Sequence, residues 1–287
     1  MMTTTLNPPP PTAPQPAGPA GQPPASGTPR VIAIVLIVFG GLVILGAILS
    51  AVISTAAAAS VHTTTRSVAV TGVSDLDVDV AAGALRIEFA DVQEAELEVT
   101  SSWGADRWTF DHQDDRLVVA SPQRIGPWFF DGWFANGPGD AVLRLPSSLE
   151  GSNADISLAA GDLEVQGAFG ELALDLGAGR ADIGGSAETL TADVSAGRAD
   201  LDLDDVSTAS LSVSAGALNA DLTGSQPDEI TVDVSAGSME LSVPEGDYDV
   251  TSDVSAGGFD NGVGSSPGAS STIDVKVSAG QVTLRAR

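Results

Sequence analysis

The sequence predicts an all-β fold, a parallel β-solenoid (β-helix-like) with rungs of about 18–21 residues. Three observations predict it. An Ala-Gly pair recurs along the chain, apolar residues alternate with period two on both sides of each pair, and the intervening positions are Asp, Ser, Thr, Glu or Arg. A disordered Pro-rich tail and one transmembrane helix are predicted to precede this repetitive part.

The N-terminal 70 residues differ from the rest in composition. Residues 1–30 hold ten of the 17 prolines and too few apolar side chains to fold, so we expect a disordered cytoplasmic tail. Residues 31–53 carry no charge, and a helix of this length spans about 34 Å, enough to cross a bilayer core of about 30 Å. Arg30 precedes this span, which predicts a cytoplasmic N-terminus. Residues 54–70, rich in Ala, Ser and Thr, are the predicted juxtamembrane linker.

The remaining residues, 71–287, are strongly acidic. All 38 Asp and Glu residues lie in this part, against ten of the 12 basic residues. We expect it to be the extracytoplasmic domain of a single-pass protein of the bacterial cell membrane, in contact with the lipid bilayer only through residues 31–53. So acidic a surface repels phosphate backbones, which excludes nucleic acid as a partner. The absence of cysteine excludes disulfides and thiolate metal sites.

The Ala-Gly pairs are predicted to be tight corners, each between two strands. Glycine permits a positive φ at a corner, and the small alanine lets successive turns stack. One rung alone cannot bury its apolar row, so rungs must stack about 4.8 Å apart. A β-sandwich of hairpins is the alternative, although the corners lack the Asn-Gly or Asp-Gly of tight hairpins. The corner glycines are Gly83, Gly161, Gly179, Gly197, Gly216, Gly237, Gly257 and Gly280.

The pattern changes toward its end. The alternation is interrupted around Gly257, where we expect an irregular rung or a loop. The sequence stops at Arg287 within a strand-like pattern. The last repeat is therefore predicted to form an uncapped solenoid edge, open to self-association.

An aromatic insertion occupies about residues 100–140, between the first two Ala-Gly pairs. It contains strand-like stretches and a loop rich in Gly and Pro at residues 125–140. One interpretation is a contact surface for an envelope protein, a glycan or the outer leaflet of the membrane. The other is a plug over the open core of the first rung. The predicted partner-binding residues of the loop are Trp128, Phe129, Phe130, Trp133 and Phe134.

Catalysis finds little support in the residue types present. The chain has two histidines, His62 and His112, and no cysteine, which argues against Ser-His-Asp and Cys-His mechanisms. We therefore predict no enzyme, no catalytic residue and no cofactor; an enzyme acting on polysaccharides through paired carboxylates is a distant alternative.

Acidic residues recur in register with the repeat. Asp175 and Asp193 occupy equivalent positions in adjacent rungs, as do Asp182 and Asp200, so the carboxylates of each pair should lie about 5 Å apart. These rows are interpreted either as solvated acidic faces or as pairs bridged by Ca²⁺.

Four motifs in this order resemble a known family: Val80–Ile87, Asp114–Val119, Ala141–Pro146 and the corner Val194–Leu201. The family is the bacterial "putative adhesin", Toastrack-like β-strand-repeat family, whose function is uncharacterised, and the resemblance covers about residues 68–287. It implies a membrane-anchored, envelope-facing solenoid and supplies no catalytic residue. The predicted function is non-enzymatic cell-surface binding, adhesion-like or scaffolding; the alternative is an accessory role in sensing cell-envelope stress.

Overall fold

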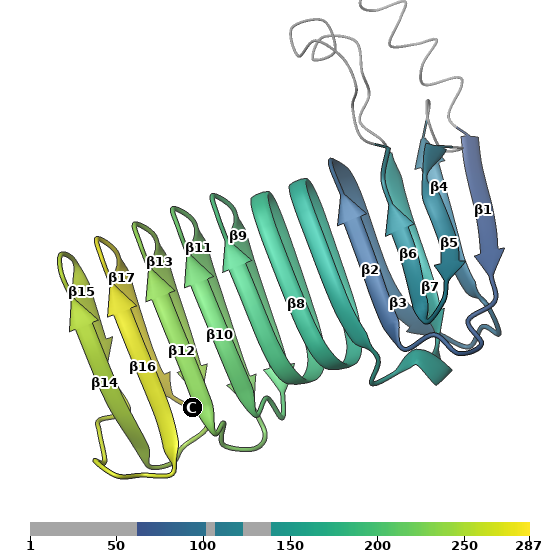
Figure 1. The fold of residues 1–287 in the computed structure, drawn as a ribbon. Coiled ribbons are helices and arrows are strands. Elements are labelled where there is room, and N and C mark those ends of the chain that lie inside the picture. The colour runs from purple at the N-terminus through teal and green to yellow at the C-terminus, as the bar shows by residue number, and fades with distance from the viewer. Residues whose placement is uncertain (1–61, 102–106, 123–138) are drawn as a thin grey trace, which may run out of the picture. The chain divides into compact units, whose positions relative to one another are not determined.

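The computed structural model describes residues 62–101, 107–122 and 139–287 (Figure 1). This part of the chain is all-β, which confirms the predicted fold class. Its strands are β1 (His62–Val68), β2 (Asp75–Val80), β3 (Gly83–Ala90), β4 (Ala95–Ser101), β5 (Thr109–Gln113), β6 (Arg116–Ala120), β7 (Asp140–Pro146), β8 (Asn153–Val194), β9 (Arg198–Asp204), β10 (Thr208–Val213), β11 (Ala217–Thr223), β12 (Glu229–Val234), β13 (Ser238–Val243), β14 (Tyr248–Val254), β15 (Gly258–Asn261), β16 (Ser271–Val277) and β17 (Gln281–Ala286). A 3₁₀ turn, η2 (Ser147–Leu149), follows β7.

The predicted tail (1–30) and membrane span (31–53) lie outside the described residues. Within the described ranges, no helix has the length and apolar character needed to cross a membrane. Strand β1 falls inside residues 54–70, so the β-structure begins earlier than the predicted linker boundary.

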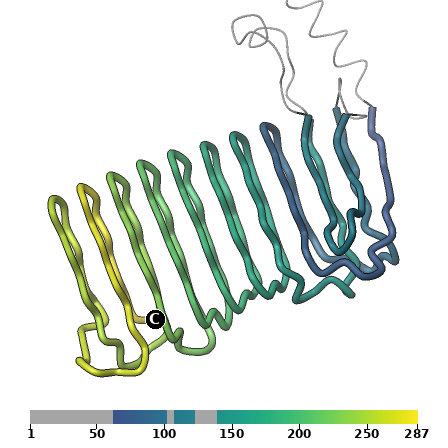
Figure 2. Tube along the Cα trace, in the orientation of Figure 1, coloured from purple at the N-terminus to yellow at the C-terminus, as the bar shows by residue number. Residues whose placement is uncertain are grey.

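The repeats stack as two arrays of strands (Figure 2). The first array contains the strands that lead into the corners, such as β10 and β12, and the second contains those that leave them, such as β11 and β13. Strand β8 winds around several corners and contributes to both arrays (Figure 1). Equivalent residues of successive repeats pair in parallel, as in Leu211 between Ala192 and Val232.

The core lies between the two arrays and consists of aliphatic rows. In the first array, Leu190, Ala209, Ile230 and Ile273 follow one another in register and are all buried. The predicted period-two alternation is therefore confirmed, with polar side chains on the outer faces. Each fully buried Val, Leu or Ile contributes about 1.5–3 kcal/mol, so the rows supply most of the stabilisation.

The corner glycines are required for space, and some of them for their backbone conformation as well. Four have a positive φ, as predicted: Gly83 (116°), Gly161 (131°), Gly179 (111°) and Gly257 (123°). The other four do not, and there a Cβ would lie 2.4–2.7 Å from the carbonyl oxygen of the neighbouring corner glycine; they are Gly197, Gly216, Gly237 and Gly280. Close stacking therefore requires glycine itself, whereas alanines such as Ala215 and Ala236 are exposed at the corners.

The rung that comes first in sequence is not the outermost. Strands β2 and β3 pair with β8 on one side and with β6 and β7 on the other. Beyond these, β5 pairs with β6, β4 with β7 and β1 with β4, all antiparallel. The strand-like stretches expected within the insertion are confirmed as strands, but they form an additional rung and its edges.

The opposite end is also out of sequence order. Strand β16 lies between β12 and β14, and β17 lies between β13 and β15 (Figure 1). The expectation that the last repeat forms the edge is therefore wrong. The edge is the β14–β15 rung around Gly257, which is followed by a loop at residues 262–270.

Core polarity and charge both favour this order. Ser252 aligns with Val275, and Asn261 with Leu284, so the β14–β15 rung has polar side chains at positions that are apolar in the core. Burying them between two rungs would cost free energy, which favours a place for this rung at the end of the stack. Lys276 aligns with both Asp233 and Asp253, and its Nζ lies 3.8 Å from an Asp233 carboxylate oxygen. Sequential stacking would instead place Asp253 directly beside Asp233, a repulsive cross-strand pair.

Candidate binding surface

The outer face of the second array carries a row of acidic and amide side chains. Asp182 pairs in register with Asp200, Asp200 with Asn219, and Asn219 with Glu240. A second row, two positions further along each strand, contains Asp202, Asp221 and Ser242. Because strand neighbours lie about 4.8 Å apart, the two rows form a continuous polar sheet surface.

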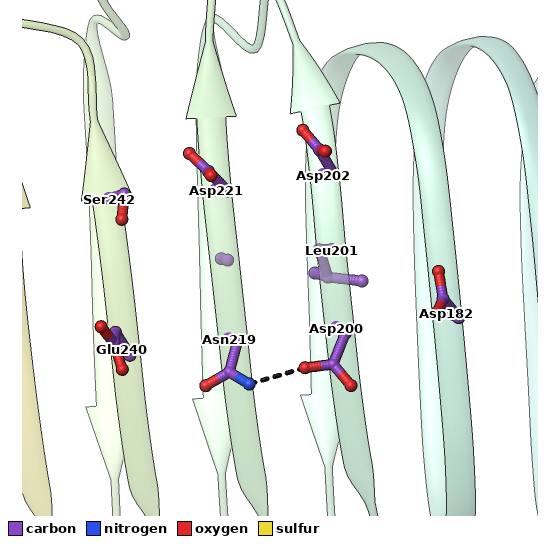
Figure 3. A pocket seen from close by; sticks show the side chains of 9 residues that line it. Asp182, Asp200, Leu201, Asp202, Asn219, Asp221, Glu240 and Ser242 are labelled. Atoms are coloured by element: carbon purple, nitrogen blue, oxygen red, sulfur yellow. Dashed lines mark hydrogen bonds between the residues drawn. The ribbon is translucent and has the colours of Figure 1, made fainter. Parts of the chain in front are cut away.

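These rows line a shallow depression of about 290 Å³ (Figure 3). The Asn219 side chain donates a hydrogen bond of 2.6 Å to Asp200 Oδ1, which separates two carboxylates along the row. Asp221 pairs with Arg287 through one carboxylate oxygen, while its Oδ1 is buried without a hydrogen-bond partner. Oxygen acceptors dominate the surface, so it suits ligands that present N–H or O–H donors.

The ion pairs of the described residues lie toward the two ends of the stack. Arg144 bridges Glu88 (3.3 Å) and Glu98 (3.0 Å) at one end, and Arg285 pairs with Glu240 toward the other. Among the described residues, no cation lies within ion-pair distance of Asp182, Asp200 or Asp202. Arg180 and Arg198 stand two residues before Asp182 and Asp200 on the same strands, so the centre of the face combines acidic side chains with two arginines that form no direct ion pair with them.

The four candidate metal-binding carboxylates do not form one group. Asp182 and Asp200 are partners on the second array, whereas Asp175 and Asp193 belong to the segments of β8 in the first array. In the described ranges, no three His, Cys, Asp or Glu side chains come together as a metal site. A Ca²⁺ bridge would thus rest on two carboxylates, although Ca²⁺ takes six to eight oxygen ligands.

Local hydrogen bonds tune individual carboxylates elsewhere. Ser74 donates a hydrogen bond of 2.6 Å to Asp75, Asn153 donates a second, and together they lower the pKa of Asp75. Hydrogen bonds from Ser225 likewise lower the pKa of Asp205. Hydrogen bonding to Glu98 raises the pKa of Arg144. All three effects favour the charged forms of these side chains.

The five predicted partner-binding aromatics, residues 128–134, lie outside the described residues, but their flanking strands are described. The segment that contains them joins β6 to β7, and it therefore takes the place that an Ala-Gly corner holds in other rungs. Its flanks lie at the corner side, because Ala120 pairs with Asp79 and Asp140 pairs with Ala84. The sequence predicts the insertion but not that it replaces a corner. The period-two alternation in β6 and β7 indicates a strand of a rung on either side of the insertion.

Two aromatic residues from the same region plug the core. Trp108 is 2% exposed and Phe110 is 8% exposed at the end formed by β1 and β5. Arg66 of β1 donates a hydrogen bond of 2.9 Å to the Trp108 carbonyl oxygen. These two residues therefore lie beside the β6–β7 rung and not over the first rung, because β5 pairs with β6.

Three solved structures from bacteria are similar to this chain. They are a "putative cell adhesion protein" from Clostridium sporogenes (TM-score 0.32, 10% identity, 79% of this chain and 100% of that chain), a "putative adhesin" from Bacteroides fragilis (0.43, 14%, 79% and 97%) and a "putative adhesin" from Parabacteroides distasonis (0.33, 12%, 79% and 97%). No family model and no curated protein matches the sequence. These TM-scores assign the chain to no family, and its function is inferred from its own residues.

Proposed function

We propose that this chain is a membrane-anchored, non-enzymatic surface-binding protein with an adhesion-like role, in which a parallel β-solenoid presents an aromatic contact segment. The observation that carries the proposal is the replacement of one tight corner, between β6 and β7, by a segment rich in aromatic residues. A tight corner suffices for the fold elsewhere, so the longer segment is not needed to close the rung.

The start of β1 and the flanks of the aromatic segment share one side of the β-structure. His62 of β1 pairs with Ser101, and Thr100 pairs with Asp140, so β1 begins at the corner side. The proposal further includes a membrane span at residues 31–53, with the β-structure on the extracytoplasmic face of a bacterial cell membrane. Trp and Phe rings suit envelope glycans, proteins and the membrane interface.

The described surface supports binding over catalysis. The acidic depression is shallow and lined by carboxylates that repeat with the rungs, and Asp182 and Asp200 are equivalent side chains in successive rungs. Hydrolytic enzymes that use two carboxylates place them in different environments, with pKa values driven apart. Carboxylates that repeat with the rungs on an open sheet face do not form such a pair of unlike carboxylates.

The test uses the full-length chain in detergent micelles and one probe, peptidoglycan sacculi. Cosedimentation with the sacculi is expected for the native chain and is expected to be lost in the double variant Trp128→Ala, Trp133→Ala. The matched control, Trp128→Phe with Trp133→Phe, keeps aromatic rings and should retain binding. Equal binding by all three chains would refute the proposed contact segment.

A further inference from the structure

The β14–β15 rung leaves one side of each strand unpaired. Strand β14 pairs with β16 and β15 with β17, and neither has a second strand partner among the described residues. The loop at residues 262–270 covers only the first half of β14. There Ser266 N donates to Tyr248 O (2.7 Å), and the Val250 N–H donates to Ser265 Oγ (3.1 Å). The half nearer the corner is open.

The open half offers both backbone groups and apolar surface. Backbone groups of alternate residues face the same side of a strand, so Ser252 and Val254 direct their N–H and C=O groups outward, as Val250 does. Val254 is 39% exposed, although its equivalents Val277 and Val234 are 0% exposed in the inner rungs. An aliphatic row of the core therefore ends uncovered at this edge.

Charges beside the edge repeat an arrangement that the chain already uses. Asp253 aligns through Lys276 with Asp233, and Asp260 aligns through Thr283 with Glu240. The β16–β17 rung stacks on β12–β13 with Lys276 beside Asp233 and Arg285 paired with Glu240. The outer side of β14–β15 thus presents equivalent acids, while residues 248–261 include no basic side chain.

We propose that the β14–β15 edge binds an extended segment of a partner protein in which apolar residues alternate with Lys or Arg, added as one more parallel rung. Its backbone would bond to the outward groups of Ser252 and Val254. Its apolar side chains would cover Val254, and its basic side chains would lie beside Asp253 and Asp260. A second copy of this chain fits less well, because both copies carry a net charge of −26.

A labelled synthetic peptide with the sequence of residues 271–287 is the probe, because this segment already stacks on an equivalent acidic rung. Its binding to the full-length chain in detergent micelles is measured by fluorescence anisotropy. A peptide in which Lys276, Arg285 and Arg287 are replaced by Glu should not bind. Ser252→Pro removes an outward N–H without touching a hydrogen bond to β16, and it should abolish binding.

A charge-matched pair of variants controls for folding and for net charge. Asp253→Asn with Asp260→Asn should weaken peptide binding about five- to tenfold, as expected for the loss of two partly exposed ion pairs. Asp114→Asn with Asp115→Asn removes the same charge from the exposed turn between β5 and β6, at the other end of the stack, and should leave binding unchanged. Melting curves of each variant confirm that it is folded.

Four results would overturn the proposal. Absence of peptide binding refutes it directly. If binding survives Ser252→Pro, the peptide has replaced the chain's own β16–β17 rung. If binding is weakened only by the further variant Asp182→Asn with Asp200→Asn, the peptide lies on the sheet face. If the chain self-associates, does not bind the peptide, and loses self-association in Ser252→Pro, the edge binds a second copy of the chain instead.

Discussion

Replacing Gly237 by alanine tests whether corner glycines are required for space alone. Gly237 does not have a positive φ, so alanine can adopt its backbone conformation. A Cβ there would lie 2.4 Å from Gly216 O and 2.4 Å from Val213 Cγ1. Both are shorter than any normal van der Waals contact, and Gly216 O also accepts a hydrogen bond of 3.1 Å from Ser238 N. The two rungs must therefore separate locally.

The expected cost combines two effects. Overpacking by one methyl group costs about 1–3 kcal/mol, and weakening one backbone hydrogen bond adds about 1 kcal/mol. A total of about 2–4 kcal/mol lowers the melting temperature of a domain of this size by roughly 4–16 °C. Gly179→Ala should cost more, because Gly179 combines a φ of 111° with a Cβ position only 2.0 Å from Gly161 O.

Circular dichroism melts of the full-length variants measure this effect. The control is Ala236→Ser, since Ala236 is exposed at the same corner and the substitution should leave the melting temperature unchanged. An unchanged melting temperature for Gly237→Ala would refute the steric argument. A fall of equal size in both variants would mean that the corner is sensitive to any substitution.

Three further predictions concern charge and pH. Burial raises the pKa of Tyr248 to about 12. Stability should therefore fall between about pH 10 and 12, where the unfolded chain loses this proton and the folded chain keeps it. Tyr248→Phe should remove that fall in alkaline denaturation curves, and an identical fall in the variant would contradict the assignment. Lys276→Glu places a third acid between Asp233 and Asp253 and should lower the free energy of unfolding, measured by urea denaturation, by about 0.5–2 kcal/mol. Adding Asp253→Lys should restore part of this stability. If it restores none, the charge of Lys276 is not the cause. Asp182→Asn relieves repulsion with Asp200 and should raise the melting temperature slightly at low salt but not at high salt. Ca²⁺ should stabilise the native chain no more than Mg²⁺ does. A rise in melting temperature that is selective for Ca²⁺ and is lost in Asp182→Asn would instead reveal a Ca²⁺ site.

Much of the fold follows from the period of the pattern. The alternation around Gly197 and Gly237 specifies which side chains face inward, and it aligns successive rungs, because a slip of one residue would turn every apolar side chain outward. The registers Leu211↔Ala192 and Leu211↔Val232 agree with that alignment. Local periodicity is therefore sufficient for the rung and its stacking.

The order of the rungs depends on comparisons between distant residues. Ser252 and Asn261 mark the β14–β15 rung as the less apolar one, and Lys276 marks β16–β17 as compatible with acidic neighbours on both sides. Each signal depends on a comparison of several candidate neighbours, which a local repeat does not provide. The position of β6–β7 outside β2–β3 likewise depends on pairing between distant residues.

The candidate surface was predicted in part. The rows Asp182–Asp200 and Asp200–Asn219 follow directly from the repeat. The cations that neutralise its ends do not, because Arg285 and Arg287 reach acids on strands more than 40 residues earlier. Two of the acids that line the depression, Glu240 and Asp221, are therefore paired with cations that the repeat does not predict.

The exchanged positions of the last two rungs affect how the chain is completed during synthesis. Strands β14 and β15 leave the ribosome before β16 and β17, yet they occupy the outer place. A nascent chain that has not reached residue 271 can stack β14 only beside β12, with Asp253 facing Asp233. That repulsion makes the early arrangement weak and reversible, so the later rung can displace it. A chain that ends before residue 271 is therefore expected to hold the β14–β15 rung weakly, and limited proteolysis of such a truncated chain should cut there first.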